Sequence, residues 1–257
     1  MKQFIPSLII CSFLILVLFS AGCITGSQGN QTPTGPVTGS MITISAGGKD
    51  YPAYLAVPST AGKHPGIVLL HSFNGLEQGY KDMIERMAGD GYVVIAPEWQ
   101  TYGQQAGDPE VEAIVRSSVA LLETRQEVDP ARIGLTGFCA GGRYTMLFLP
   151  QVQDLKAGVA FYGFPYSRGY TNDTTPAEQI GSLVDPILIL HGSGDAPSPI
   201  DGIYNYTKEL DDAGTYYELK VYQGKPHGFM IANGSLATDD AATDAYTQMI
   251  NFFQRKL

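Results

Sequence analysis

Cysteine, histidine and basic side chains are scarce in this chain of 257 residues. Its three cysteines and four histidines do not stand at the spacing of a zinc site. The chain has 16 Lys and Arg residues and 25 Asp and Glu residues, which gives a formal net charge of −9. This charge argues against a basic surface that would bind nucleic acid. No phosphate loop or dinucleotide fingerprint is present. We therefore expect no metal, no cofactor and no nucleic-acid partner, while the sequence leaves the oligomeric state open.

Only one long hydrophobic run occurs, and it lies at the N-terminus. Lys2 precedes the apolar stretch 4–19, and the small residues 20–22 lead to Cys23. This pattern resembles a lipoprotein signal, in which residues 1–22 are removed and the Cys23 thiol carries lipid. An ordinary secretory signal is one alternative, and an uncleaved anchor is another, because the run approaches the roughly 18 residues that span a bilayer. Each reading predicts an extracytoplasmic protein, and the first and third predict attachment to a membrane.

Large apolar side chains are almost absent from the segment that follows the signal. Residues 23–40 consist mainly of Thr, Gly, Gln, Pro, Ser and Asn, so we expect a disordered tether there. The folded domain would then span residues 41–257. Cys139 is the single thiol of that domain, which excludes a disulfide within it.

Within the domain, apolar segments of strand length alternate with amphipathic segments of helix length. This alternation predicts the α/β class, with a mostly parallel central sheet flanked by helices. An irregular stretch is expected over 163–181. The predicted strands span 41–46, 54–58, 66–70, 91–96, 132–136, 157–161, 187–190 and 216–222, and the predicted helices span 80–89, 110–127, 143–148, 203–213 and 241–256.

The segment Gly137–Gly142 reads Gly-Phe-Cys-Ala-Gly-Gly between a predicted strand and a predicted helix. Strand, Gly-x-nucleophile-x-Gly and helix form the nucleophile elbow of α/β-hydrolases, here with Cys139 in place of serine. The glycines are needed because neighbours with side chains collide in so sharp a turn. The helix N-terminus also favours a thiolate. A lone cysteine is usually buried and inert, but this position favours a nucleophile.

Two polar loops follow later strands, at the edge of the sheet where α/β proteins bind ligands. Asp195 lies in the first loop and His227 in the second. The chain order of nucleophile, acid and base matches that of the α/β-hydrolases, so we predict a triad of Cys139, Asp195 and His227. Imidazole would accept the thiol proton, and the carboxylate would orient the imidazole. Asp201 is the nearest alternative acid, but its place favours the N-cap of the next helix.

The segment after the strand 66–70 is expected to complete the site. Backbone N–H groups of Phe73 and Ala140 would form an oxyanion hole, in which one donor contributes roughly 3–4 kcal/mol to transition-state stabilisation. Of the other histidines, His64 is expected in a solvated turn, and His191 is expected to brace the loop of the acid by hydrogen bonds.

These motifs resemble the dienelactone hydrolase family. The elbow Gly137–Gly142 matches the family signature, and His191–Asp195 and His227–Phe229 match its acid and base segments. The resemblance covers about residues 41–257. It implies the α/β-hydrolase fold with little or no lid, and hydrolysis of a small-molecule ester or lactone through an acyl-cysteine intermediate.

One departure from the family concerns activation of the nucleophile. The family often has His-Glu at the end of the oxyanion strand, where the Glu assists activation of the cysteine. Here His71 matches, but Ser72 replaces the Glu. We therefore predict that Cys139 pairs with His227 in the resting state.

A second departure concerns the substrate. The arginine segment that holds the dienelactone carboxylate in the family has no clear match, because residues 99–108 carry Trp, Gln, Tyr and Gly but no Arg. Arg143 could face the pocket, but its place one helical turn past Cys139 favours a position on the helix surface. The aromatic loops favour a neutral, partly apolar ester, thioester or lactone. The candidate substrate-binding residues are His71, Ser72, Trp99 and Arg143.

Two other functions compete with ester hydrolysis. A thioesterase or acyl-transfer enzyme would use the same triad, so the sequence does not separate it from an esterase. A non-catalytic binding protein at the cell surface would share the hydrolase fold but would not need the triad. Retention of Cys139, Asp195 and His227 argues against that second alternative.

Overall fold

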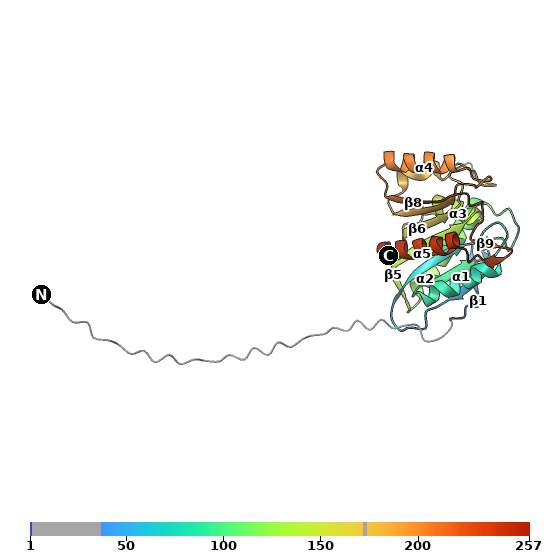
Figure 1. Cartoon of the computed structure of the whole chain (residues 1–257). Coiled ribbons are helices and arrows are strands. Elements are labelled where there is room, and N and C mark those ends of the chain that lie inside the picture. The colour runs from blue at the N-terminus through green and yellow to red at the C-terminus, as the bar shows by residue number, and fades with distance from the viewer. Residues whose placement is uncertain (2–36, 172–173) are drawn as a thin grey trace. The chain divides into compact units, whose positions relative to one another are not determined.

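The computed structural model describes Met1 and residues 37–171 and 174–257 (Figure 1). The predicted signal, the lipidation site Cys23 and most of the predicted tether lie outside the described residues. Contacts of the domain begin earlier than the predicted start at residue 41. Val37 packs against the hydrophobic core, and the backbone N–H of Gly39 donates to a carboxylate oxygen of Glu85 at 3.0 Å. In the part of the chain that is described, no helix is both long and apolar enough to cross a membrane.

Strands and helices alternate along the described chain as the sequence predicts. The strands are β1 Ser40–Ala46, β2 Lys49–Ala56, β3 His64–Leu70, β4 Val93–Pro97, β5 Val128–Phe138, β6 Leu155–Phe161, β7 Ile187–Gly192, β8 Tyr217–Tyr222, β9 Ile231–Ala232 and β10 Ser235–Leu236. The helices are α1 Gln78–Gly89, α2 Asp108–Thr124, α3 Ala140–Phe148, the short 3-10 helix η1 Ala177–Ser182, α4 Ile200–Asp212 and α5 Asp240–Lys256.

The central sheet has eight strands in the order β1-β2-β4-β3-β5-β6-β7-β8. The pairs β1–β2 and β2–β4 are antiparallel, and every pair from β4 to β8 is parallel. β5 lies near the middle, so the elbow that follows it stands between the ends of β3 and β6. This topology confirms the predicted α/β-hydrolase class with a mostly parallel sheet.

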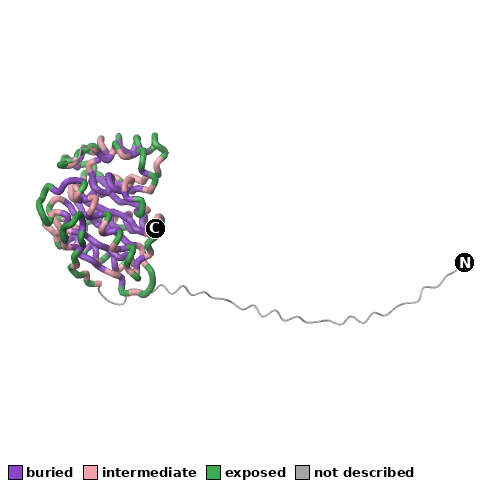
Figure 2. The backbone as a smooth tube through the Cα atoms, turned by 180° about the vertical axis from the view of Figure 1, so that it is seen from behind, coloured by how far each residue is buried: buried purple, intermediate pink, exposed green. Residues whose placement is uncertain are grey.

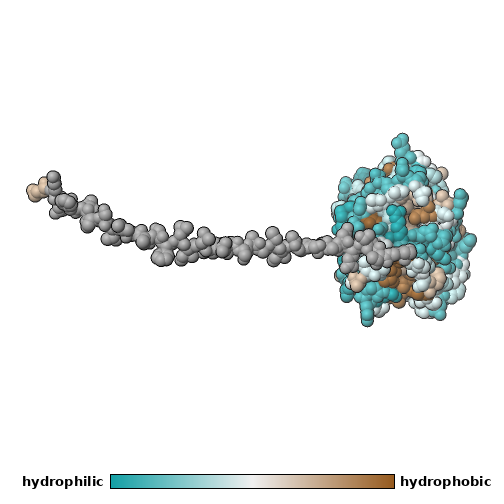
Figure 3. All heavy atoms as spheres, turned by 60° about the horizontal axis from the view of Figure 1, so that its bottom comes forward, coloured by the Kyte–Doolittle hydropathy of each residue, from teal (hydrophilic) through white to brown (hydrophobic). Residues whose placement is uncertain are grey.

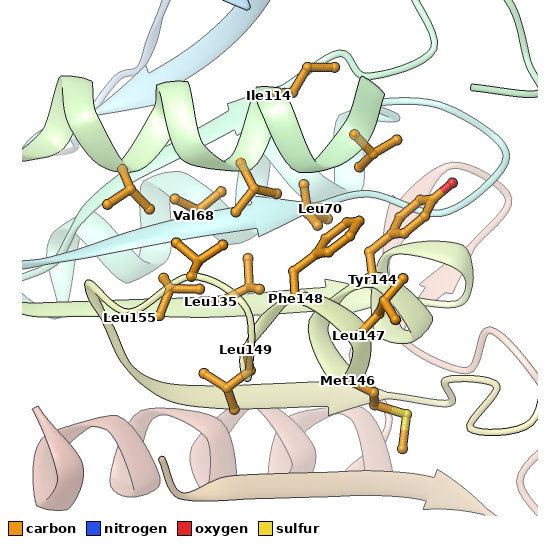
Figure 4. Packing of buried hydrophobic residues seen from close by; sticks show 14 of the residues in the cluster. Val68, Leu70, Ile114, Leu135, Tyr144, Met146, Leu147, Phe148, Leu149 and Leu155 are labelled. Carbon is orange, nitrogen blue, oxygen red and sulfur yellow. The ribbon is translucent and has the colours of Figure 1, made fainter. Parts of the chain in front are cut away.

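Helices cover both faces of the sheet, and each face has its own core (Figures 1 and 2). Successive residues of β3 alternate between them: Val68 and Leu70 pack toward α2 and α3, while Ile67 and Leu69 pack toward α1 and α5. Figure 4 shows part of the first core, in which Val68 and Leu70 of β3 lie between α2 and the side chains of α3. Burial of each such side chain stabilises the fold by about 1.5–3 kcal/mol.

The surface and the helix placement agree with the expectation of little or no lid. Each α-helix of the described residues packs on the central sheet, and none forms a separate layer over its carboxyl edge. The face of the domain in Figure 3 is mostly hydrophilic, with hydrophobic surface in small separate areas.

Several element boundaries differ from the prediction. The helix predicted over 110–127 starts at Asp108 and ends at Thr124, because Pro109 occupies its first turn and Arg125 turns into an extended conformation. The prediction for Asp201 was wrong: α4 starts at Ile200, and Asp201 lies in its first turn without a capping hydrogen bond. The small hairpin β9–β10 was not predicted.

Candidate active site

Cys139 stands at the turn between β5 and α3 with φ 58° and ψ −114°. This left-handed conformation is costly for a residue with a side chain, and it persists only where the surroundings enforce it. The backbone N–H of Cys139 donates to the carbonyl oxygen of Phe161 at 3.1 Å, which ties the turn to β6. The sharp elbow that the sequence predicts is therefore present.

Close backbone packing explains the glycines of the elbow. A Cβ atom on Gly137 would lie 2.1 Å from the carbonyl oxygen of Gly141, and a Cβ atom on Gly141 would lie 2.1 Å from that of Leu70. Neither contact is possible for a real side chain. The two glycines allow α3 to approach β5 and β3 closely enough to present the thiol at the edge of the sheet.

The loops after β7 and β8 bring Asp195 and His227 together. The Nδ1 atom of His227 lies 2.8 Å from Oδ2 of Asp195, and the N–H of Ser198 donates to Oδ1 of the same carboxylate at 2.8 Å. The two loops are also joined directly, because the N–H of Gly194 donates to the carbonyl oxygen of Lys225 at 3.0 Å. Asp195 is buried, so the carboxylate holds one orientation of the imidazole.

The electrostatics of this pair favour a charged His227. Burial lowers the pKa of His227, but the hydrogen bond to Asp195 and the interaction with the Cys139 thiol outweigh burial and raise this pKa to about 9. The Nε2 atom of His227 is buried and makes no hydrogen bond of regular geometry. His227 and Cys139 line the same small cavity.

The two backbone groups predicted as an oxyanion hole border the thiol. Phe73, Cys139 and Ala140 line one cavity together. Ala140 is the first residue of α3, so its N–H has no acceptor within the helix. The N–H of Phe73 donates to no other backbone group of the described residues. Both donors are available to a ligand oxygen.

Cys139 borders two cavities of different character. The larger cavity has a volume of about 350 Å³ and is rich in aromatic side chains, namely Phe73, Trp99, Tyr144, Phe164 and Tyr170. The smaller cavity has a volume of about 170 Å³, includes His227, and carries the polar side chains of Ser72, Asn74, Glu77, Tyr80 and Tyr162. A substrate whose acyl carbon meets Cys139 can extend into both.

Arg143 borders the larger cavity but is not a helix-surface residue. Its guanidinium group is buried and donates to both carboxylate oxygens of Asp108, at 2.9 and 2.8 Å. It also donates to the carbonyl oxygens of Ser167 and Thr174, at 2.8 and 3.3 Å. The prediction of a surface position was wrong because the charged partner lies on α2, far away in sequence. Arg143 fixes the start of α3 against α2 and the loop after β6.

His71 and Trp99 occupy different positions at the site, although both were candidate substrate contacts. Trp99 is buried and lines the larger cavity. His71 lines neither cavity beside Cys139; its ring stacks on Trp99 at 5.1 Å, and its Nδ1 lies 2.7 Å from the carbonyl oxygen of Ser72. Burial lowers the pKa of His71 to about 4, against the smaller opposite effect of the Ser72 carbonyl. His71 is a neutral support for the oxyanion segment, which corrects its proposed contact with substrate.

Ser72 faces the smaller cavity, and its hydroxyl accepts a hydrogen bond from the N–H of Asn74 at 3.2 Å. His191 is fully buried and its Nε2 lies 2.8 Å from the carbonyl oxygen of Ser198, which confirms that it braces the loop of Asp195.

His64 is half-buried at the start of β3 and does not lie in a solvated turn as predicted. Its two ring nitrogens lie 3.1 and 3.0 Å from the carbonyl oxygens of Gly91 and Thr60.

Three residues at the site were missed from the sequence. The position of Asp108 could have been noticed in the sequence, because it stands before Pro109 at the start of a helix. The loop that precedes it lies at the edge of the sheet where the active site was predicted. Tyr162 and Glu77 had none: Tyr162 follows a buried strand with φ 37°, and Glu77 is the residue that precedes α1. Only the fold brings both of them to the smaller cavity.

The sheet topology, the elbow at Cys139 and the loops after β7 and β8 together define an α/β-hydrolase. A model of the Dienelactone hydrolase family matches residues 51–257, and the chain belongs to this family.

Curated relatives and solved structures agree with the assignment. A Salmonella typhimurium protein named "Putative carboxymethylenebutenolidase" is 28% identical over 246 residues, which cover 87% of this chain and 89% of the relative. "Protein usf" of Aquifex pyrophilus is 29% identical over 240 residues, covering 85% of this chain and 99% of the relative. The structure titled "Putative Dienelactone Hydrolase" from Klebsiella pneumoniae has a TM-score of 0.78 and 27% identity, covering 85% of this chain and 99% of that chain.

A more distant likeness concerns the fold alone. The Pyrococcus horikoshii acylaminoacyl peptidase has a TM-score of 0.74 at 20% identity, and the match covers 87% of this chain but 42% of the peptidase. The same fold therefore also occurs as one part of a longer chain.

Proposed function

We propose that this protein is a cysteine hydrolase that cleaves a carboxylic ester or lactone through an acyl-cysteine intermediate. The observation that carries the proposal is the 2.8 Å contact between Asp195 Oδ2 and His227 Nδ1. The second ring nitrogen, Nε2, is buried, and His227 and Cys139 line the same small cavity. Nucleophile, base and orienting carboxylate are the parts that covalent acyl transfer requires.

In the first half of the reaction, the proton of the pair already lies on Nε2 of the charged His227, and the Sγ atom of Cys139 attacks the acyl carbon as the thiolate. The negative charge that develops on the carbonyl oxygen is stabilised by the N–H groups of Phe73 and Ala140. Collapse of this intermediate breaks the bond to the leaving oxygen, which takes the proton from Nε2. The alcohol departs and the acyl group stays on Sγ.

In the second half, Nε2 of His227 accepts a proton from a water molecule as that water attacks the thioester carbon. The bond between the carbon and Sγ then breaks, Sγ leaves as the thiolate beside the protonated His227, and the carboxylic acid departs. Asp195 stabilises the imidazolium in both halves, because its Oδ2 accepts the hydrogen bond from Nδ1.

The test uses p-nitrophenyl acetate with the wild-type protein and with Cys139→Ala. We expect turnover and a transient acetyl adduct in the wild type by intact-mass spectrometry, and neither in the variant. Turnover that survives in the variant would contradict a cysteine nucleophile. Absence of both turnover and adduct in the wild type would favour a binding protein that keeps the fold.

Attachment to a membrane through Cys23 stays a prediction from the sequence, and we propose it as the reason for an extracytoplasmic location. Labelling of growing cells with radioactive palmitate tests it, with Cys23→Ser as the matched control. Label on the wild-type protein alone would support lipid attachment, and an unlabelled wild-type protein would contradict it.

A further inference from the structure

We propose that the two cavities beside Cys139 divide the substrate between them: the larger holds an aromatic acyl group, and the smaller holds a short alcohol that carries a further hydroxyl. This inference rests on the proposed function and adds the substrate class to it. The substrate would be an ester of an aromatic carboxylic acid with a small polyhydric alcohol.

The position of His227 decides which cavity takes which part. The leaving oxygen must receive its proton from Nε2 of His227, so it has to lie within hydrogen-bond reach of that nitrogen. His227 lines the smaller cavity alone, whereas of the two residues whose N–H groups would hold the carbonyl oxygen, Ala140 lines the larger cavity and Phe73 lines both. The alcohol therefore leaves from the smaller cavity, and the acyl chain extends into the larger.

The lining of the larger cavity suits a neutral ring. Trp99 and Tyr144 are buried and meet edge to face, with ring centroids 5.4 Å apart. Both guanidinium groups at this cavity already have carboxylate partners: Arg143 binds Asp108, and Arg168 lies 3.3 Å from Glu178. A cavity of about 150 Å³ holds a benzene ring, so about 350 Å³ is ample for an aromatic acid.

The lining of the smaller cavity suits hydroxyl groups. Tyr162 is buried, and its hydroxyl makes no hydrogen bond of regular geometry with the described residues, although the backbone of Met230 interacts with it, so a ligand hydroxyl can still pair with it. The hydroxyl of Tyr80 is buried there as well and accepts from the N–H of Ser72 at 3.3 Å. Glu77 adds a carboxyl group whose pKa is raised by burial. A hydroxyl of the leaving alcohol can accept from Tyr162 and donate to Glu77.

Volume alone does not make this distinction, since about 170 Å³ would also admit a ring. A ring in the smaller cavity would give the Tyr162 hydroxyl no ligand partner and would remove Glu77 from water. Sites built to bind a polar group discriminate strongly against ligands that lack it. Polarity therefore sets the orientation of the substrate.

Two isomeric esters test the orientation directly. In 2-hydroxyethyl benzoate the ring is on the acyl side and the hydroxyl on the leaving side, and in benzyl glycolate the two are exchanged. Both release a primary alcohol, and each rate is divided by that of hydroxide-catalysed hydrolysis. We expect the benzoate to have a kcat/KM at least about tenfold higher. Equal values, or a preference for benzyl glycolate, would overturn the proposal.

A second comparison tests the smaller cavity alone. Propyl benzoate replaces the hydroxyl of 2-hydroxyethyl benzoate by a methyl group. We expect the wild type to prefer the hydroxyl ester by about tenfold, and Tyr162→Phe to lose most of that preference. Tyr166→Phe is the matched control, because its hydroxyl binds Glu209 at an exposed site. An unchanged preference in Tyr162→Phe would show that this hydroxyl does not bind the alcohol.

Failure of this inference and failure of the proposed function give different results. If p-nitrophenyl acetate acylates Cys139 but neither benzoate nor glycolate is cleaved, the hydrolase stands and the substrate class is wrong. If no ester acylates Cys139, the proposed function itself is wrong. Should Tyr162→Phe fail to fold, the two isomers on the wild-type protein still decide the orientation.

Discussion

Two buried carboxylates stand at the candidate site, and they have different partners. Asp108 receives two hydrogen bonds from the guanidinium group of Arg143, whereas Asp195 receives one from the N–H of Ser198 and one from Nδ1 of His227. Both carboxylates are less than 5% exposed. The similarity ends with the chemistry of the cation, because a guanidinium group does not release its proton in proteins and an imidazolium does.

This difference assigns separate tasks to the two pairs. The Asp108–Arg143 pair holds α2, α3 and the loop after β6 in place, and so shapes the larger cavity. In the mechanism that we propose, the Asp195–His227 pair holds a proton for exchange with Cys139 and the substrate. Burial of a charge is therefore not by itself a sign of catalysis, and the partner decides what the charge does.

The largest expected effect comes from changing Asp195 to Asn. The amide keeps the shape but no longer stabilises the imidazolium, so kcat/KM on p-nitrophenyl acetate should fall by about 10³- to 10⁴-fold. Urea unfolding of the same variant checks that the fold is retained. If the variant folds and its kcat/KM falls by less than tenfold, Asp195 would only support the structure, as Asp108 does.

A loss of stability is expected from Arg143→Ala. The change leaves the Asp108 carboxylate buried without its cation, which should lower the free energy of unfolding by about 3–5 kcal/mol. Urea unfolding measures this, and the double variant Asp108→Leu with Arg143→Met should recover much of the loss. If unfolding were unchanged while KM rose, Arg143 would bind substrate rather than support the cavity.

The third effect is on the titration of His227. Its pKa of about 9 means that the imidazole stays charged through neutral pH in the folded protein. The stabilisation that this charge provides is present below the unfolded value near 6.5 and is lost as pH rises through about 9. Histidine NMR should give a midpoint near 9, which Asp195→Asn lowers. A wild-type midpoint near 6.5 would contradict the charged pair.

The smallest effect concerns His71, a buried group with no charged partner. The pKa of His71 is about 4 in the folded protein and near 6.5 in the unfolded chain. Below pH 6.5 the unfolded chain therefore binds more protons than the folded protein. The free energy of unfolding should therefore fall as pH drops from 6.5 toward 4, by about 1.4 kcal/mol per pH unit from this residue. Urea unfolding of wild type and His71→Phe at pH 7 and 5 measures it, and equal slopes would exclude His71 as the cause.

The sequence by itself determined the class of fold and the reactive loops. Apolar strands that alternate with amphipathic helices admit few arrangements other than a parallel sheet. The glycines around Cys139 encode the elbow locally, because only they tolerate the close approach of α3 to β5. Asp195 and His227 were found because each follows a strand end, and parallel strands end at one edge.

Only the tertiary structure decided how the remaining side chains combine. Arg143 and Asp108 are 35 residues apart, and nothing local to either predicts the pair. Glu77 precedes the elbow in the sequence and Tyr162 follows it, yet both residues line the smaller cavity. Such contacts depend on which side chains the packed sheet brings within a few ångströms of each other. Local pattern carries no information about that distance, and so the cavities appear only in the folded chain.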